Sequence, residues 1–373
     1  MVWHLPRAHD TDVRFSDWLG PYAPENVVTN DDLAKIVDTT DEWIRSRSGI
    51  AQRHFVSEDQ ATSDISVVAG QRALEKAGLD AKDLDLILLA TSSPDHLTPP
   101  TSSQVQDRLG ANCGAMTLQV GCTGFVYGLV TASQFIQTGA YKNILVIGAE
   151  IISKNLDMTD RTTCVLFGDG AGAVVLQAAD TPCGVRSFEL GSDGAQFEAI
   201  IADSPGTRIP VSQRAVDERL HYLRMDGRAV FKFATRTMGE SLTRVMSQAG
   251  VTPEAIDLFI PHQANARIIE YAAKAFDLPM EKVVMNVERY GNTSAATIPI
   301  ALSEALDEGR AKPGDTLAFV GFGAGLTWAS CLFDMGPMVG DHQLDDDREV
   351  IQGRPPTPDT VIGDGGIVEG LIA

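Results

Sequence analysis

The chain of 373 residues lacks the features that would place it in several broad classes. No apolar run is long enough to span a bilayer, and the segment 1–18 mixes charges with apolar residues, so no signal peptide is expected. Positive charge is scarce, because 30 Lys and Arg face 50 Asp and Glu, for a net charge of −20. This balance disfavours attraction to nucleic acids and anionic membranes. We therefore expect neither as a partner.

Cysteine and cofactor patterns are also sparse. The five cysteines form no close pair and no metal-ligand cluster, which predicts reduced thiols, no metal site and a cytoplasmic protein. There is no Walker A sequence. The glycine-rich runs 168–172 and 323–325 precede strand-like residues rather than helices, and they lack the acidic partner of a dinucleotide site. We therefore expect no cofactor.

Apolar strands and amphipathic helices alternate through both halves of the chain. The predicted strands are 84–91, 116–120, 143–149, 256–260, 283–286, 316–320 and 329–333, and the main predicted helices are 63–77, 230–249, 264–276 and 295–308. Such alternation predicts an α/β protein whose helices cover a mostly parallel sheet. The same order of elements occurs before about residue 180 and again after it, which indicates a duplication.

Four regions follow from this pattern. We expect an irregular N-terminal arm at 1–20, an N-terminal half at 21–180, a C-terminal half at 181–336 and an acidic, disordered tail at 337–373. The tail lacks hydrophobic periodicity and is rich in Gly, Pro and acids, a composition that stays solvated. Within the C-terminal half, 181–225 is rich in Gly, Pro and polar residues, which predicts irregular structure or short antiparallel strands.

The strongest candidate for a reactive residue is Cys122, in the stretch LQVGCTGF at 118–125. The buried strand predicted at 116–120 is expected to turn at Gly121, and from Thr123 apolar residues recur at helical spacing. The free N–H groups and the positive dipole end of a helix N-terminus favour a thiolate. Cys122 would then act as a covalent nucleophile, although by position alone a buried structural cysteine fits equally well.

Two further candidates lie at junctions between predicted strands and helices. His262 follows the strand 256–260, at the carboxyl end where open α/β sheets bind ligands; a structural histidine beside a helix cap would look the same. Asn292 lies in RYGNTS at 289–294, which is also ordinary turn and N-cap chemistry. A thiolate with an imidazole and a carboxamide that both donate to one carbonyl would accept an acyl group and stabilise an enolate.

The sequence resembles the β-ketoacyl-acyl carrier protein synthase III family of the thiolase fold, from about residue 26 to 333. The matching segments are TDEWI (40–44), GCTGF (121–125), TDR (159–161), FGDGAG (167–172), PHQAN (261–265) and YGNTSA (290–295). The resemblance implies a thiolase-like fold of two duplicated βαβαβαββ halves, layered α-β-α-β-α, and a homodimer. The arm before Tyr22 lacks the family's Gly-rich first strand, and the tail after Gly336 has no counterpart.

The resemblance also implies roles for the candidate residues. Cys122 would accept the acyl group, and His262 and Asn292 would bind the malonyl thioester carbonyl. The backbone amides of Cys122 and Ala324 would form the oxyanion hole, with Ala324 in the glycine-rich turn 321–325.

For the acyl-CoA substrate, the resemblance assigns Trp43 and Arg161 to sandwich the adenine and Arg47 to contact the phosphates. Thr98 stands where members that prefer acetyl primers commonly carry Phe, at the far end of the acyl pocket and across the dimer interface. Exchanging a phenyl ring for a hydroxyl and a methyl predicts primers longer than acetyl. Neighbouring side chains that refill the space would remove this preference.

An acidic carrier protein would meet an acidic enzyme, so docking needs a local basic patch. Lys232 and Arg236 lie one helical turn apart, and Arg267 and Lys274 lie two turns apart on the next predicted helix, so each pair shares a face. The resemblance places Lys232, Arg267 and Lys274 near the tunnel mouth. The alternative is a set of ordinary solvated charges.

We therefore expect decarboxylative condensation of an acyl-CoA primer with malonyl-acyl carrier protein, which gives a 3-oxoacyl product and begins fatty-acid synthesis. Two alternatives stay open. An acyltransferase or polyketide starter enzyme of the same fold would use another acceptor, although plain acyl transfer needs no enolate site. A non-catalytic assembly subunit should have lost the cysteine, and this chain retains Cys122.

Overall fold

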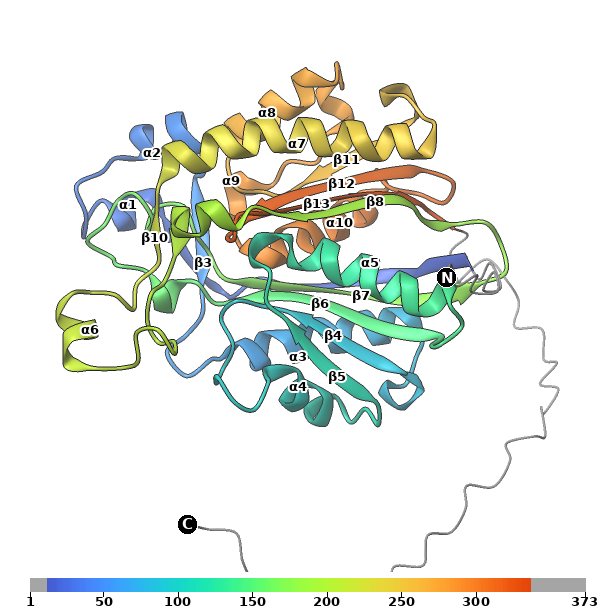
Figure 1. Ribbon diagram of the computed structural model, residues 1–373, viewed down its shortest axis with the longest axis horizontal. Helices are drawn as coiled ribbons and strands as arrows, with labels where there is room; N and C mark the ends of the chain where they lie inside the picture. The colour runs from blue at the N-terminus through green and yellow to red at the C-terminus, as the bar shows by residue number, and fades with distance from the viewer. Residues whose placement is uncertain (1–11, 337–373) are drawn as a thin grey trace, which may run out of the picture. The chain divides into compact units, whose positions relative to one another are not determined.

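The computed structural model describes residues 12–336, and the expected acidic tail at 337–373 lies outside the described residues. Three layers of helices alternate with two β-sheets (Figure 1). The outer helices are α7 (Gly227–Ala249) and α8 (Ala266–Ala275) over one sheet and α3 (Thr62–Ala77) and α4 (Thr101–Leu109) over the other, and the central pair is α5 (Gly124–Gln137) and α10 (Thr297–Asp307). The expected α-β-α-β-α layering is confirmed.

Each of the two large sheets is built from the strands of one half of the chain. The first sheet has the order β1-β7-β6-β4-β5, with β1 at Asp12–Tyr22, β7 at Gly170–Ala179, β6 at Asn143–Glu150, β4 at Leu86–Ala90 and β5 at Gly114–Leu118. The second has the order β11-β12-β13-β8, with β11 at Leu258–Pro261, β12 at Thr316–Gly323, β13 at Thr327–Asp334 and β8 at Gly184–Ser192.

Strand pairing shows that the two halves share one topology. In the first sheet β4 pairs in parallel with β5 and β6, and the pairs β6–β7 and β7–β1 are antiparallel. In the second, β11 pairs in parallel with β12, and the pairs β12–β13 and β13–β8 are antiparallel. Val283 forms a parallel bridge to Phe259, in the place that β5 takes beside β4. The duplication is confirmed, but the predicted strand 283–286 is reduced to this bridge.

The core lies on both faces of each sheet. Every residue of β4 and β12 is buried, because helices cover these strands on both sides and the chain supplies continuous apolar runs there. The central helix α5 is apolar around most of its circumference, as packing between two sheets requires. Phe15 of β1 stacks on Phe333 of β13 with ring centroids 3.9 Å apart, which joins one sheet to the other.

The expected irregular arm at 1–20 is wrong for residues 12–20, which form most of β1. This strand pairs with β7, and its side chains at Val13 and Phe15 are buried. A Cβ atom at Gly20 would lie 1.9 Å from the carbonyl oxygen of Ala69, so glycine lets the strand pass directly against α3. Residues 1–11 lie outside the described residues.

Two other predictions differ from the structure. The segment 181–225, expected to be irregular or to form short antiparallel strands, begins with β8, a full member of the second sheet. The expectation is confirmed after β8, where the short antiparallel pair at 200–201 and 224–225 lies among loops. The strand predicted as buried at 116–120 lies instead at 114–118, on the edge of the first sheet, with half-buried side chains. Both differences arise because pairing partners far along the chain decide where a strand lies and how well it is covered.

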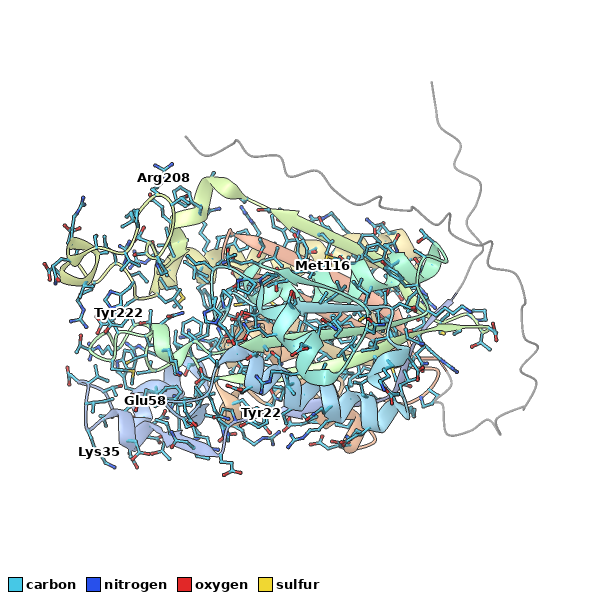
Figure 2. The ribbon with its side chains drawn as sticks, turned by 90° about the horizontal axis from the view of Figure 1, so that it is seen from below. Tyr22, Lys35, Glu58, Met116, Arg208 and Tyr222 are labelled. Carbon is cyan, nitrogen blue, oxygen red and sulfur yellow. The ribbon has the colours of Figure 1, made fainter. Side chains whose placement is uncertain are left out.

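One end of the molecule carries short helices, loops and two small sheets, one of β2 (Asn26–Thr29) with β3 (Gln52–Phe55) and one of β9 (Ile200–Ile201) with β10 (Arg224–Met225). Figure 1 shows α1 (Asn30–Leu33), α2 (Asp41–Ser48) and α6 (Gln213–Asp217) together at this end. Lys35, Arg208 and Tyr222 lie at the same end in Figure 2, well apart from Met116 on β5. Among residues 12–336, no helix combines the length and apolar character needed to cross a membrane.

Candidate active site

The three predicted catalytic side chains meet in one cavity of about 110 Å³. Cys122 comes from the N-terminal half, whereas His262 and Asn292 come from the C-terminal half. Most of the lining is apolar, with Phe167 and Met225 among its members, so a small acyl chain would find little competition from water. The fold therefore builds the site by bringing the two halves together.

Cys122 lies at a turn between strand and helix, as predicted. Gly121 adopts φ +59°, a left-handed conformation that side chains rarely take, and α5 begins at Gly124. The cysteine keeps some exposure towards the cavity. Protein surrounds the rest of the side chain, and this burial raises the pKa of the Cys122 thiol to about 12. The negative charge of Glu150 raises this pKa further, whereas a hydrogen bond with Ser294 lowers it. This burial opposes the stabilisation of a thiolate expected at a helix N-terminus.

The nucleophile's turn is in close contact with the turn after β12. A Cβ atom at Gly121 would lie 2.9 Å from the amide nitrogen of Ala324, and one at Gly323 would lie 2.6 Å from the amide nitrogen of Cys122. Only glycine allows backbone segments to approach so closely. The amides of Cys122 and Ala324 consequently lie on adjoining turns that both line the cavity.

His262 follows β11, and its imidazole is held on one side. Its Nδ1 lies 2.7 Å from the Thr297 hydroxyl oxygen, and its ring packs edge-on against Phe322. Within the described residues, its Nε2 is buried and has no hydrogen-bond partner. Burial lowers the pKa of His262 to about 3, so the ring is neutral near pH 7. A neutral imidazole with one free nitrogen faces the cavity.

Asn292 is oriented by its own backbone neighbours. The backbone N–H of Asn292 donates to the carbonyl of Leu166, and its side-chain Oδ1 accepts from the backbone N–H of Ser294 at 2.8 Å. Because Oδ1 is occupied, the carboxamide NH₂ group is the part of Asn292 left for a ligand. The sequence left open that this segment is an ordinary turn. The turn is present, and it orients the side chain of Asn292.

A buried carboxylate beside the nucleophile was missed by sequence reasoning. Glu150 ends β6 and is fully buried, and its oxygens accept hydrogen bonds from the hydroxyls of Ser93 (2.7 Å) and Ser294 (3.0 Å). The hydroxyl of Ser294 also bonds the sulfur of Cys122. Burial raises the pKa of Glu150 to about 7. The sequence feature that could have identified Glu150 is its position directly after the apolar run at 143–149.

A second cavity, of about 400 Å³, contains the residues predicted to bind coenzyme A. The guanidinium carbon of Arg47 lies 4.5 Å from the centre of the Trp43 ring, and that of Arg161 lies 5.1 Å from it. Leu166 and Met225 line this cavity and the catalytic one, so the two adjoin. The structure therefore groups Trp43, Arg47 and Arg161 beside the entrance to the catalytic cavity.

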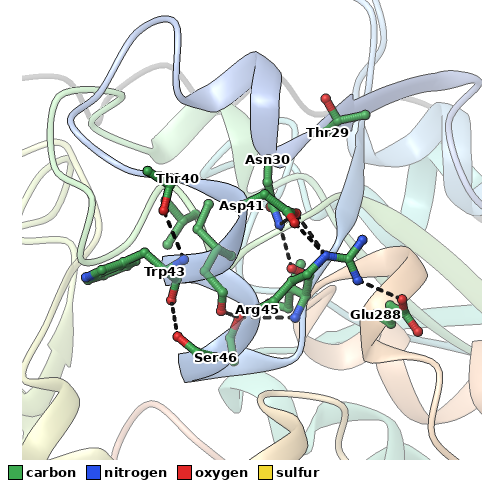
Figure 3. Close-up of polar contacts among 12 residues, drawn as sticks. Thr29, Asn30, Thr40, Asp41, Trp43, Arg45, Ser46 and Glu288 are labelled. Atoms are coloured by element: carbon green, nitrogen blue, oxygen red, sulfur yellow. Dashed lines mark hydrogen bonds and ion pairs between the residues drawn. The ribbon is translucent and has the colours of Figure 1, made fainter.

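The helix that carries Trp43 is anchored by polar contacts on its other side (Figure 3). The Thr40 hydroxyl caps α2 by accepting from the amide of Trp43 at 3.1 Å. Arg45 pairs with Asp41 and, at 2.9 Å, with Glu288. Glu288 belongs to α9 (Val287–Tyr290), which ends two residues before Asn292. The anchoring leaves the Trp43 ring pointing away from this network, towards the cavity.

The predicted docking residues lie on the neighbouring outer helices. Lys232 is on α7, Arg267 and Lys274 are on α8, and all three are exposed. Among the ion pairs of residues 12–336, none involves these three side chains. Arg267 also lines the cavity of Trp43 and Arg161 and lies over the ring of Phe231. Thr98 is exposed and lies outside the catalytic cavity of the single chain.

Comparisons with known proteins agree with this geometry. The family model 3-Oxoacyl-[acyl-carrier-protein (ACP)] synthase III matches residues 116–194, and the model of its C-terminal part matches residues 246–335. Beta-ketoacyl-[acyl-carrier-protein] synthase III of Caldanaerobacter subterraneus subsp. tengcongensis is 50% identical over 312 residues, which cover 83% of this chain and 94% of that protein. The enzyme of the same name from Geobacillus kaustophilus is 49% identical, over 85% of this chain and 97% of its own.

A solved structure shows the same architecture. The crystal structure of 3-oxoacyl-[acyl-carrier-protein] synthase III from Aquifex aeolicus VF5 matches with a TM-score of 0.81 at 43% identity, over 86% of this chain and 99% of that chain. Fold and cavity together define a condensing enzyme of the thiolase fold.

The close relatives make the assignment specific: the chain belongs to the β-ketoacyl-[acyl-carrier-protein] synthase III family. It is an acyltransferase that condenses acyl-CoA with malonyl-acyl carrier protein and initiates fatty-acid synthesis. The family, the fold class and the reaction expected from the sequence are confirmed.

Proposed function

We propose that Cys122 carries the acyl group and that His262 and Asn292 hold the malonyl thioester that condenses with it. The convergence of these three side chains on one apolar cavity carries the proposal. Transfer of the acyl group to sulfur releases coenzyme A. Loss of CO₂ from the malonyl group then leaves an enolate, whose carbon attacks the acyl thioester and whose oxygen is stabilised by the two donors.

Thr297 supports the donor role of His262. Its hydroxyl donates to the carbonyl of Ser294 at 2.9 Å, and the same proton can turn to the Nδ1 of His262, 2.7 Å away. When the proton points to Nδ1, the ring carries its own proton on Nε2, which then donates to the substrate carbonyl. We assign this arrangement to the condensation step. The NH₂ group of Asn292 supplies the second donor.

The oxyanion hole follows from the contact between the two turns. The amides of Cys122 and Ala324 would both donate to the oxygen of the tetrahedral intermediate. Gly121 and Gly323 support this role, because any side chain there would separate the two backbones.

Coenzyme A would enter through the cavity that Trp43 and Arg161 line. A ring stacked between two planar groups needs roughly 7 Å, two contact distances of about 3.5 Å each. Arg161 lies 5.1 Å from the Trp43 ring and bonds to Asp38, so binding would move its guanidinium outwards by about 2 Å. Arg47 remains beside the ring for the phosphates.

The carrier protein would dock on the surface formed by Lys232, Arg267 and Lys274. These cations lie on two helices that pack together, and they have no acidic partner within the described residues. Phosphopantetheine from a carrier protein bound there would enter beside Arg267. The local positive charge offsets the acidic background at short range.

A homodimer would pair the exposed edge of the first sheet. The edge strand β5 keeps half-buried side chains, and Leu97, in the loop after β4, is 74% exposed. A second copy would cover this region and bring its Thr98 to the acyl pocket. The five cysteines lie within the described residues and form no disulfide there, which suits a reducing compartment, and we assign the enzyme to the cytoplasm.

Intact-mass measurement tests the central role of Cys122. Incubation with acyl-CoA alone should add one acyl group to the wild-type enzyme and none to Cys122→Ala. Cys113→Ala is the matched control, because Cys113 is also partly exposed but lies outside the cavity. An acyl group on Cys122→Ala would overturn the assignment.

A further inference from the structure

Glu150 occupies a site that the condensation steps leave without a role. It is fully buried, and four donors point at its carboxylate: the amide of Ser92 and the hydroxyls of Thr91, Ser93 and Ser294. An ionised carboxylate only accepts hydrogen bonds, so a shell made entirely of donors matches the anion. The bond with Ser93 is the shortest of the four, at 2.7 Å.

Ser294 joins this carboxylate to the nucleophile. Its hydroxyl lies 3.0 Å from Oε1 of Glu150 and bonds the sulfur of Cys122. Ser294 has φ +51°, a left-handed conformation that residues other than glycine seldom adopt. Its amide is simultaneously bonded to Asn292. A strained residue held in this way sets the direction of its hydroxyl within the site.

The nucleophile needs a proton acceptor. Burial keeps the Cys122 thiol protonated near neutral pH, and the thiolate is the form that attacks a thioester. His262 is neutral and holds a single ring proton. Within the described residues, Nε2 of His262 has no hydrogen-bond partner, whereas the Ser294 hydroxyl bonds the sulfur of Cys122, so the direct path for the thiol proton leads to Ser294.

We propose that Glu150 accepts the proton of Cys122 through the hydroxyl of Ser294 when acyl-CoA acylates the enzyme. The S–H bond breaks and its proton bonds to the Ser294 oxygen, while the original hydroxyl proton bonds to Oε1 of Glu150. The thiolate attacks the acyl carbon, and the departing sulfur of coenzyme A takes up this proton. Coenzyme A leaves as a thiol, and Glu150 is again a carboxylate.

The surroundings of Glu150 define the pH dependence of this relay. Ser294 and the residues after β4 present hydroxyls and one amide to it, and Cys122 is the titratable group that senses its charge. A second buried carboxylate, Asp169, precedes β7 and bonds to Ser153 and Val56 instead. Because burial raises the pKa of Glu150 to about 7, acylation should speed up as the pH rises through that value.

The test measures acylation by itself, as release of coenzyme A from acyl-CoA without carrier protein. Glu150→Gln and Ser294→Ala should slow this step at least about tenfold. Glu150→Gln should also lose the rise through pH about 7, and Glu150→Asp should keep the rise at a reduced rate. Decarboxylation of malonyl-acyl carrier protein by Glu150→Gln should stay at the wild-type rate.

Asp169→Asn is the matched control, since it changes a buried, hydrogen-bonded carboxylate that does not contact Ser294. Wild-type acylation with an unchanged pH profile in Glu150→Gln would overturn the relay, as would an equal loss in Asp169→Asn. If Glu150→Gln lost both half-reactions, Ser294→Ala would decide, because it retains Glu150 and three of its donors. The inference rests on acylation at Cys122, and a wild-type enzyme without an acyl group would refute that assignment separately.

Discussion

A Cβ atom at Gly323 would lie 2.6 Å from the amide nitrogen of Cys122, so the turn that ends β12 touches the backbone of the nucleophile. The contact is reciprocal, because a Cβ atom at Gly121 would lie 2.9 Å from the amide nitrogen of Ala324. The two halves of the chain meet at these glycines. The position of the thiol relative to both amides therefore depends on having no side chain at either point.

Gly323→Ala should lower the rate of condensation at least about tenfold by displacing the Cys122 amide from the oxyanion hole. Gly239→Ala is the control, because a Cβ atom there has no neighbour within 4 Å. That substitution lies inside α7 and should leave activity unchanged while adding about 0.5–1 kcal/mol to the free energy of unfolding. Steady-state rates measure the activity of both variants, and thermal melts measure their stability. Full activity in Gly323→Ala would contradict the role of this contact in positioning the Cys122 amide.

His262→Ala and Asn292→Ala should still gain an acyl group from acyl-CoA but should decarboxylate malonyl-acyl carrier protein about 10²-fold more slowly or worse. The reason is that their donors act on the enolate, whereas the thiol reacts in the earlier step. Mass spectrometry and CO₂ release separate the two half-reactions. Complete loss of acylation in His262→Ala would show that the imidazole is also needed to activate Cys122.

Thr297→Val should impair decarboxylation and spare acylation, because it removes the hydroxyl that fixes Nδ1 of His262. The loss should be smaller than in His262→Ala, since the ring remains. Thr243→Val provides the control: its hydroxyl bonds the carbonyl of Gly239 on the exposed side of α7, far from the cavity lining. Equal rates for wild type and Thr297→Val would remove Thr297 from the mechanism.

Arg267→Glu should raise the KM for malonyl-acyl carrier protein several-fold, with the largest effect at low salt, and should slow acylation by acyl-CoA to a smaller extent, because Arg267 also lines the cavity of Trp43. Lys82→Glu makes the same charge change at an exposed position between α3 and β4, and it should affect neither step. Equal damage to both half-reactions in Arg267→Glu would indicate a disturbed fold instead of a docking defect.

The wild-type enzyme should accept primers longer than acetyl, and Thr98→Phe should shift its preference towards short ones. Each methylene that a longer primer buries contributes about 0.8 kcal/mol, which a phenyl ring in the same space would prevent. A series of acyl-CoAs of increasing length, scored by 3-oxoacyl product, measures the preference. Much faster condensation of acetyl-CoA than of hexanoyl-CoA by the wild type would show that another group closes the pocket.

Local signals in the sequence predicted much of the framework. The long helix α7 ends before Gly250, which takes the left-handed conformation of a C-cap, as its composition indicated. The apolar runs of β4 and β6 became strands covered on both faces. The candidates Cys122, His262 and Asn292 could be selected because each follows a strong strand signal, at the end where α/β sheets place their sites.

The sequence by itself determined the α/β class, the central strands and main helices, and the three side chains that meet in the cavity, because each rests on a local pattern. Only the tertiary structure decided that residues 12–22 form a strand, since their pairing partner β7 is remote. It also decided the pKa values of Cys122 and Glu150. Burial sets these values, and the hydroxyl that links the two residues belongs to Ser294, which lies 144 positions from Glu150 along the chain.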